Sequence, residues 1–224
     1  MESPVEEYPA LSRYDDDQAR RYEGKRFRSL RGKVVDTLEW VLLRRSLARL
    51  RRAAGEVHSI VDVPIGTGRM ARRLQAMGFS VTGTDASKDM LEVARGHTSA
   101  GAYLVGRIEQ LPLADGSVDA VACVRLFGHL PPAAKLAGLQ EIHRVARQGA
   151  VVFVAGRTTW LEVRRKWQAR RGRHLGYWHP IGAAEATALA AQAGFTVSAR
   201  LRLLGPLAET WALVLVSDRL ATGA

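Results

Sequence analysis

The sequence contains little cysteine, little lysine and no long apolar run. Cys123 is the only cysteine among 224 residues, which excludes a disulfide framework and a cysteine-ligated zinc site. The six histidines are scattered along the sequence without accompanying cysteines, and we expect no metal site. No run of about 18 apolar residues occurs, so no membrane-spanning helix is expected. The segment MESPVEEYPA lacks a basic region and an apolar core, so we expect a cytoplasmic protein without a secretory signal.

The composition is that of an ordinary folded protein. Hydrophobic residues make up 47% and charged residues 25% of the chain, which excludes disorder as the main state. The length suits one domain with a full core.

The positive charge is concentrated in one segment. The formal net charge is +11, and 28 of the 33 cations are arginines. Residues 57–156 carry only +2 of this excess, whereas residues 157–173 carry +6. Nucleic acid or another anionic surface is therefore a possible partner, through that segment.

The apolar pattern alternates between helical and strand periods. Helices are predicted over residues 17–52, 69–77, 88–95, 132–147 and 182–193, and strands over 57–63, 80–84, 102–105, 118–124, 150–155, 195–204 and 211–217. Ser87 is expected to cap a helix, and Gly78, Gly149 and Gly194 to end helices. This alternation indicates an α/β fold, a doubly wound Rossmann-like sheet with helices on both faces.

A glycine turn follows the first predicted strand, in Asp62-Val-Pro64-Ile-Gly66-Thr-Gly68. Glycines allow close approach of a ligand to the backbone, and the next helix presents free N–H groups. Gly66-x-Gly68-x-x-Ala71 alone also fits a dinucleotide fingerprint, or an ordinary tight turn. The next strand ends in Asp85, which could bind ribose hydroxyls.

Asp62 discriminates between two cofactors. A carboxylate at this place repels a pyrophosphate and attracts an ammonium or a sulfonium. This favours S-adenosylmethionine over NAD, although Asp62 could also only cap the turn through backbone amides.

Four segments in order resemble the class I S-adenosylmethionine-dependent methyltransferases, especially the small-molecule group that includes the ubiquinone-biosynthesis type. They are the turn at 62–68, Val81-Thr-Gly-Thr-Asp85-Ala-Ser87, the stretch from Gly106 to Asp119, and Glu141-Ile-His-Arg-Val-Ala-Arg-Gln-Gly149. The resemblance implies a seven-stranded sheet of order 3-2-1-4-5-7-6 with the last strand antiparallel. Pro64 departs from the family, where a glycine is usual.

The resemblance also implies a set of cofactor-binding residues. Asp62, Pro64, Gly66 and Gly68 would line the methionine part, and Asp85 would hold the ribose. The adenine would lie near Ala86, Met90, Arg107 and Ile108, and Arg125 would lie beside the amino-acid part. Arg107 is a departure, because many relatives carry an aspartate there and arginine cannot accept a hydrogen bond. The Ile108 backbone and stacking on the Arg107 guanidinium would then read the adenine.

Two histidines are candidate catalytic bases. His129 follows the fourth strand, at the edge where doubly wound sheets bind ligands, and an imidazole titrates near neutral pH. It could instead cap the helix that begins at Pro131-Pro132. His179 lies in Gly176-Tyr-Trp-His-Pro180, where it could meet a flat acceptor or pack as a lid hinge.

Two further segments have competing interpretations. Residues 1–56 are expected to form a helical lid, in which Tyr22 and Arg26 would face the cofactor or simply belong to a solvated helix. Residues 57–224 would form the methyltransferase domain, with a basic insert at about 157–181. That insert could cap the substrate, lie on a membrane surface, bind RNA or be a solvated helix face.

We therefore expect methyl transfer from S-adenosylmethionine to oxygen, nitrogen or carbon of a small, anionic or aromatic acceptor, leaving S-adenosylhomocysteine. The alternatives are an RNA or protein methyltransferase that docks through residues 157–173, and an S-adenosylmethionine-binding protein that does not methylate. A hydride-transfer enzyme is more distant.

Overall fold

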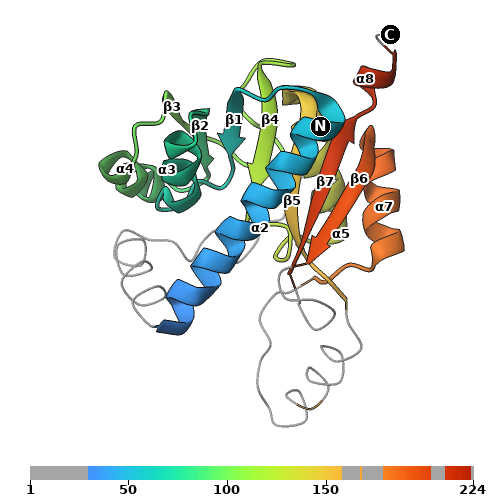
Figure 1. Ribbon diagram of the computed structural model, residues 1–224, viewed down its shortest axis with the longest axis horizontal. Coiled ribbons are helices and arrows are strands. Elements are labelled where there is room, and N and C mark those ends of the chain that lie inside the picture. Colours follow the sequence, from blue (N-terminus) through green and yellow to red (C-terminus); the bar gives the residue numbers. More distant parts are fainter. Residues whose placement is uncertain (1–29, 158–166, 168–178, 203–209, 223–224) are drawn as a thin grey trace, which may run out of the picture.

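The computed structural model describes residues 30–157, 167, 179–202 and 210–222. Its centre is a seven-stranded sheet in the order β3-β2-β1-β4-β5-β7-β6 (Figure 1). The strands are β1 (Ser59–Asp62), β2 (Ser80–Asp85), β3 (Ala102–Val105), β4 (Val118–Cys123), β5 (Ala146–Ala155), β6 (Phe195–Arg202) and β7 (Thr210–Ser217). The predicted order is confirmed.

The strand directions also agree with the prediction. β1 pairs in parallel with β2 and β4, and the parallel pairs β2–β3 and β4–β5 extend the sheet. β7 runs antiparallel between β5 and β6. The chain reverses its direction of travel along the sheet between β1 and β4, and such a switch point places the carboxyl ends of both strands beside one crevice.

Helices cover both faces of the sheet (Figure 1). They are α2 (Leu30–Ala54), α3 (Arg69–Ala76), α4 (Lys88–His97), α5 (Pro132–Val145), α7 (Ala183–Gln192) and the short α8 (Arg219–Thr222). On one face, Leu43 and Leu47 of α2 and Leu74 of α3 pack in one cluster with Val151 and Val214 of the sheet. Among the described helices, α2, α3 and α4 therefore share a face.

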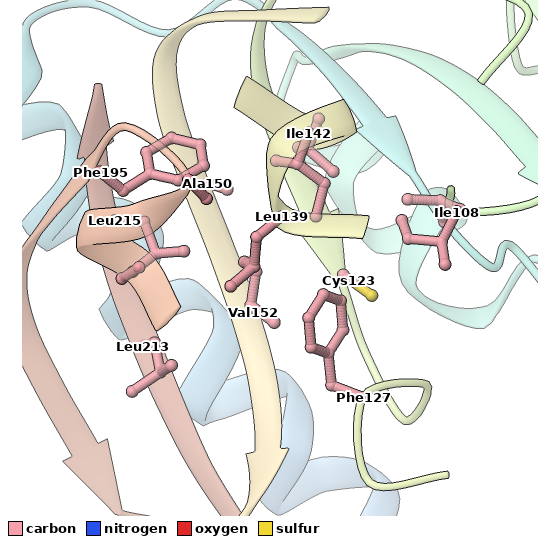
Figure 2. Packing of buried hydrophobic residues seen from close by; sticks show 14 of the residues in the cluster. Ile108, Cys123, Phe127, Leu139, Ile142, Ala150, Val152, Phe195, Leu213 and Leu215 are labelled. Atoms are coloured by element: carbon pink, nitrogen blue, oxygen red, sulfur yellow. The ribbon is translucent and has the colours of Figure 1, made fainter. Parts of the chain in front are cut away.

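The opposite face is covered by α5 and α7. Leu139 and Ile142 of α5 pack with Val152 of β5 and Leu213 of β7 in a second cluster (Figure 2). Burying one such aliphatic side chain contributes roughly 1.5–3 kcal/mol. The two clusters hold the sheet rigid beneath its carboxyl edge.

Local signals position the helix ends. The Ser87 hydroxyl accepts a hydrogen bond of 3.3 Å from the Met90 N–H, so the predicted cap is confirmed. Gly78 and Gly194 follow α3 and α7 with φ of +88° and +87°. A left-handed residue after a helix is the position that glycine favours.

The predicted end of α5 is wrong. Gly149 does not stop this helix: α5 ends at Val145, and β5 begins at the next residue, Ala146. Ala146 already pairs with Val118 of β4, so strand pairing takes over before the glycine is reached. Gly149 lies within β5, between Ala120 of β4 and Val216 of β7.

Several predicted features lie outside the described residues. They are Tyr22, Arg26, residues 17–29 of the first predicted helix and nearly all of the basic insert. Within the described residues, α2 packs on β5, β6 and β7 and so forms part of the sheet's covering layer. No described helix is long and apolar enough to cross a bilayer.

Candidate active site

The backbone of the turn between β1 and α3 borders open space at one glycine and packs closely at another. Gly66 and Gly68 have φ of +54° and +82°, in the left-handed region that favours glycine. A Cβ on Gly68 would lie 2.5 Å from Thr98 Cγ2, whereas a Cβ on Gly66 would meet no atom within 4 Å. Gly68 is therefore needed for packing, and Gly66 borders room for a ligand.

Pro64 and Ile65 fix the course of this turn. The Val63–Pro64 peptide is cis. The Ile65 N–H donates to Thr84 O at 2.9 Å, and the Ile65 side chain lies where a Cβ on Gly83 would be, 2.3 Å from its Cδ1. The turn is thereby attached to β2.

Asp62 ends β1 and is only 1% exposed. Its Oδ2 has no hydrogen-bond partner among the described residues. Burial raises the pKa of this carboxyl well above its usual range, the Ala71 N–H lowers it, and the charge of Asp85 raises it further. A buried carboxyl oxygen without a partner is costly, and a cationic ligand would compensate it.

Asp85 ends β2 and is held by backbone amides. Its Oδ2 accepts from Gly66 N–H at 2.9 Å, and its Oδ1 accepts from Ser87 N–H at 3.0 Å. Burial raises the pKa of Asp85, although the amides of Ser87, Gly66 and Ala86 lower it. The carboxylate is thus oriented beside the turn, and an ionised carboxylate has about four lone-pair sites for donors.

The residues predicted to contact the adenine follow the carboxyl ends of β2 and β3 in the sequence, and they differ in burial. Ala86 is half-buried, and Met90 of α4 is 5% exposed. Ile108 is buried in the α5-side cluster (Figure 2), so only its backbone could serve the predicted role. The Arg107 Nε lies 3.5 Å from Glu109 Oε2.

The two candidate bases lie on segments that the fold joins. The His179 N–H donates to Gly128 O at 2.8 Å, next to His129, and both histidines are half-buried. Beneath them, Lys135 of α5 donates to Leu130 O at 2.5 Å and to His179 O at 2.9 Å. Lys135 is 1% exposed, and burial lowers its pKa to about 8.

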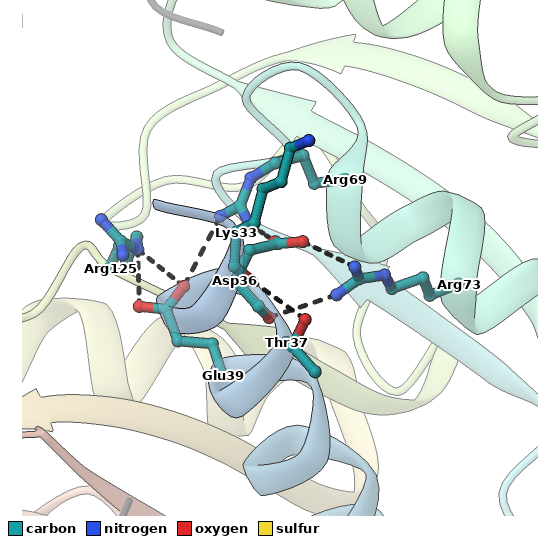
Figure 3. A network of polar contacts seen from close by, with 7 residues as sticks. All are labelled: Lys33, Asp36, Thr37, Glu39, Arg69, Arg73 and Arg125. Carbon is teal, nitrogen blue, oxygen red and sulfur yellow. Dashed lines mark hydrogen bonds and ion pairs between the residues drawn. The ribbon is translucent and has the colours of Figure 1, made fainter. Parts of the chain in front are cut away.

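A network of ion pairs connects α2 to the same edge (Figure 3). Arg125, which follows β4 with φ of +66°, donates from Nε to both oxygens of Glu39 at 2.7 and 2.8 Å. Arg69 of α3 pairs with Asp36 and lies 3.7 Å from Glu39 Oε2. Arg73 donates to Asp36 Oδ2 at 2.6 Å.

Sequence reasoning missed Glu39, Asp36 and Lys135. Glu39 is 3% exposed, and its position four residues before Leu43 places it on the apolar side of the helix, which was an available signal. Nothing local marks Lys135, because a lysine in a first helical turn is usually exposed. Among the described residues, no group of His, Cys, Asp or Glu could hold a metal ion.

The comparisons with known proteins agree with this arrangement. Residues 60–149 match the model of a methyltransferase domain family. A malonyl-[acyl-carrier protein] O-methyltransferase of Pectobacterium atrosepticum is 37% identical over 121 residues, which cover 48% of this chain and 46% of that protein. A demethylmenaquinone methyltransferase of Beutenbergia cavernae is 33% identical over 141 residues, covering 62% and 55%. The chain thus spans about half the length of these curated relatives.

Solved structures share the fold over a greater length. Magnesium protoporphyrin IX methyltransferase of Synechocystis PCC 6803, with bound SAH, superposes with a TM-score of 0.71 at 17% identity, covering 90% of this chain and 93% of that one. A SAM-dependent methyltransferase of Methanosarcina mazei gives 0.60 at 18% identity, covering 73% and 93%. Residues 60–149 are thus similar to a methyltransferase domain family, and the sheet as a whole has the fold of these solved methyltransferase structures.

Proposed function

We propose that the chain binds S-adenosylmethionine beside the β1–α3 turn and transfers its methyl group to a small-molecule acceptor. The observation that carries this proposal is the buried Asp62 carboxyl, whose Oδ2 lacks a partner among the described residues. It adjoins a turn whose Gly66 borders open space. A ligand that brings an ammonium and a sulfonium supplies the missing positive charge, whereas the pyrophosphate of NAD would add a negative one.

The remaining donors and acceptors suit the rest of this cofactor. Asp85, oriented by the amides of Gly66 and Ser87, would accept from the ribose hydroxyls. Ala86 and Met90 would contact the adenine, with the Ile108 backbone and Arg107 at its edge. Arg125, beside Glu39, would lie near the cofactor's carboxylate. Gly68 and Pro64 would shape the turn around the methionine part.

When bound, S-adenosylmethionine supplies an electrophilic methyl group. The chain's own residues then have two tasks: to align the acceptor with the methyl carbon and to remove a proton where the acceptor is a hydroxyl. Alignment alone can contribute several kcal/mol to lowering a barrier. We propose that His129 or His179, whose backbone segments are joined by the hydrogen bond from the His179 amide to Gly128 O, takes that proton through its imidazole.

The site and the relatives favour the same classes of acceptor. The curated relatives described above are named for a malonyl group on an acyl-carrier protein and for demethylmenaquinone, which are carboxylate and aromatic acceptors. Both suit an edge that carries arginines and imidazoles. We therefore favour a small anionic or aromatic acceptor over RNA.

The test is calorimetric titration with S-adenosylmethionine, S-adenosylhomocysteine and NADH. We expect both sulfur nucleotides to bind and NADH not to bind. Asp62→Asn and Asp85→Ala should each weaken binding by roughly tenfold or more, since a hydrogen bond to a charged group contributes about 1.5–3 kcal/mol. Glu92→Gln, which changes an exposed acid on α4, is the matched control and should leave the affinity unchanged.

Two results would overturn the proposal: a folded wild-type protein that binds neither sulfur nucleotide, or unchanged affinity in Asp85→Ala. The acceptor is tested separately, with labelled cofactor and a panel of carboxylates, quinols and RNA. With a hydroxyl acceptor, His129→Gln or His179→Gln should lower kcat by roughly a hundredfold while the cofactor affinity stays unchanged.

A further inference from the structure

The solvent face of α2 is densely basic in its second half. Leu43, Leu47 and Leu50 are at most 1% exposed and point to the sheet. At 100° per residue, the opposite side of the helix carries a row of exposed arginines. They are Arg44, Arg45, Arg49, Arg51 and Arg52.

Almost nothing in the described structure neutralises this row. Arg51 pairs with Glu56, but Arg44, Arg45, Arg49 and Arg52 make no ion pair with a described residue. The two acids of α2 are already bound to arginines of α3 and of the loop after β4. The neighbouring elements α3, β6 and β7 contain no acid within their bounds, and α3 adds the exposed Arg72.

The same side of the helix becomes apolar toward its N-terminal end. Leu30 is 80% exposed and Val34 50% exposed. Both residues lie on the solvent side with the arginines, next to the exposed Lys33 and Thr37, so one continuous stripe runs from a mixed end with two apolar side chains to a basic end. We call this stripe, from Leu30 to Arg52, the α2 face.

We propose that the α2 face docks on the surface of an anionic phospholipid bilayer. The arginines would lie among the anionic headgroups, where each cation contributes roughly 1 kcal/mol, or about a fivefold gain in affinity. Leu30 and Val34 would enter the headgroup–acyl boundary, which accepts apolar side chains.

A bilayer fits this stripe better than a nucleic acid does. A phosphate backbone would also attract the arginines, but it has no apolar surface on which the two exposed aliphatic side chains at one end of the stripe could be buried. The described α2 face also lacks an exposed aromatic side chain on which a base could stack. The combination of positive charge and aliphatic surface is that of a lipid-surface contact.

Docking in this orientation would place the candidate active site near the bilayer. Asp36 and Glu39 follow Val34 along the helix but face the domain, where their partners Arg69 and Arg125 connect this end of α2 to the carboxyl edge of the sheet. This consequence rests on the proposed function, whereas the docking itself does not.

The experiment is vesicle cosedimentation of the full chain. Phosphatidylcholine vesicles with roughly one third phosphatidylglycerol should bind the wild type, and phosphatidylcholine alone should not. The double variant Arg45→Gln/Arg49→Gln should lose at least tenfold in affinity. Arg95→Gln/Arg219→Gln removes the same charge from α4 and α8 and should change the affinity less than twofold. Val34→Gln should weaken vesicle binding severalfold at unchanged charge.

Calorimetry on the same variants measures cofactor affinity, which should stay unchanged. Vesicle binding and cofactor binding are therefore separate readouts, so the failure of this proposal can be told from the failure of the proposed function. The docking proposal is overturned if the wild type does not bind anionic vesicles, or if the two double variants bind them equally well. It is also overturned if the α2 face variants lose binding to an RNA oligonucleotide while vesicles bind none of the proteins.

Discussion

Asp62 and Lys135 are two titratable side chains that the fold buries almost completely, each at 1% exposure. They differ in their hydrogen bonding. Lys135 donates to two carbonyl oxygens, whereas Asp62 keeps one oxygen without a described partner. A hydrogen-bonded buried group stabilises a local geometry, and a buried group without a partner at a sheet edge is what we propose as the cofactor contact. Lys135 therefore joins the loop after β4 to the segment before α7.

Lys135 should make stability depend on pH in a defined window. Its pKa in the folded protein is about 8, below the ordinary 10.5 because of burial. Between these values the unfolded chain holds more protons, so the free energy of unfolding rises as the pH rises from 8 to 10.5. Lys135→Met removes this contribution. The stability of the wild type relative to the variant should grow by up to about 3 kcal/mol across the window.

Urea denaturation at several pH values within the window measures this difference. Lys88→Met removes an exposed lysine of α4 and controls for the loss of one positive charge. Groups common to all three proteins cancel in the comparison. A wild-type-minus-Lys135→Met difference that is flat from pH 8 to 10.5 contradicts the assigned burial.

The candidate site residues that could be placed from the sequence are those at the ends of predicted strands. Asp62 and Asp85 end consecutive parallel strands, and parallel strands bring their carboxyl ends to one edge. Lys135 could not be found in this way, because its partners Leu130 and His179 come from segments that only the folded chain brings together. Glu39 meets Arg125 across 86 residues of sequence.

At the scale of elements, α2 is attached to the domain by two different interactions. Its C-terminal half packs aliphatic side chains on β5 and β7. Its N-terminal half carries Asp36 and Glu39, which bind three arginines from α3 and the loop after β4 (Figure 3). The first attachment is apolar and nondirectional, and the second fixes the helix relative to the glycine turn.

Two glutamates of the same chain region test this second attachment. Glu39→Gln removes a 3%-exposed carboxylate from two arginines and should lower the free energy of unfolding by about 2 kcal/mol, because the arginines lose a buried partner. Glu56→Gln breaks the exposed pair with Arg51 and should cost less than about 0.5 kcal/mol. Equal effects of the two substitutions in urea denaturation would show that the network does not hold α2.

Element boundaries could be predicted where one local signal decides them. The Ser87 hydroxyl caps α4, and Gly78 adopts the left-handed conformation that follows α3. The end of α5 could not be predicted, because pairing of Ala146 with Val118 of β4 decides it. Val34 was included in the apolar period of its helix, yet it is 50% exposed, because it lies on the solvent side of α2 with the arginines.

At the scale of the whole molecule, the alternation of helices and strands predicted a doubly wound sheet, and the family resemblance predicted its strand order. The distribution of charge was harder to interpret. The sequence places most of the excess at residues 157–173, but the described structure adds a second basic surface on α2. That surface is not evident from the sum over residues 1–56, because the five arginines of residues 44–52 follow a long stretch, residues 1–39, in which eight cations and nine acids nearly cancel.

Gly149 joins the two parts of the sheet and provides a test at this scale. It lies on β5, where the parallel strands meet the antiparallel pair β7–β6. A Cβ at this position would lie 2.0 Å from Leu215 O and 3.0 Å from Leu50 Cδ1. The β7 backbone cannot move away without breaking its pairing with β5, so Gly149→Ala should lower the free energy of unfolding by about 3 kcal/mol or more, or prevent folding.

The control is Gly96→Ala in α4. A Cβ at Gly96 meets no atom within 4 Å, so this substitution should raise the free energy of unfolding by about 0.5–1 kcal/mol. Thermal denaturation of both variants decides the matter: if Gly149→Ala melts at the wild-type temperature, the close approach of β5 to β7, and with it the junction of the sheet, is not as described.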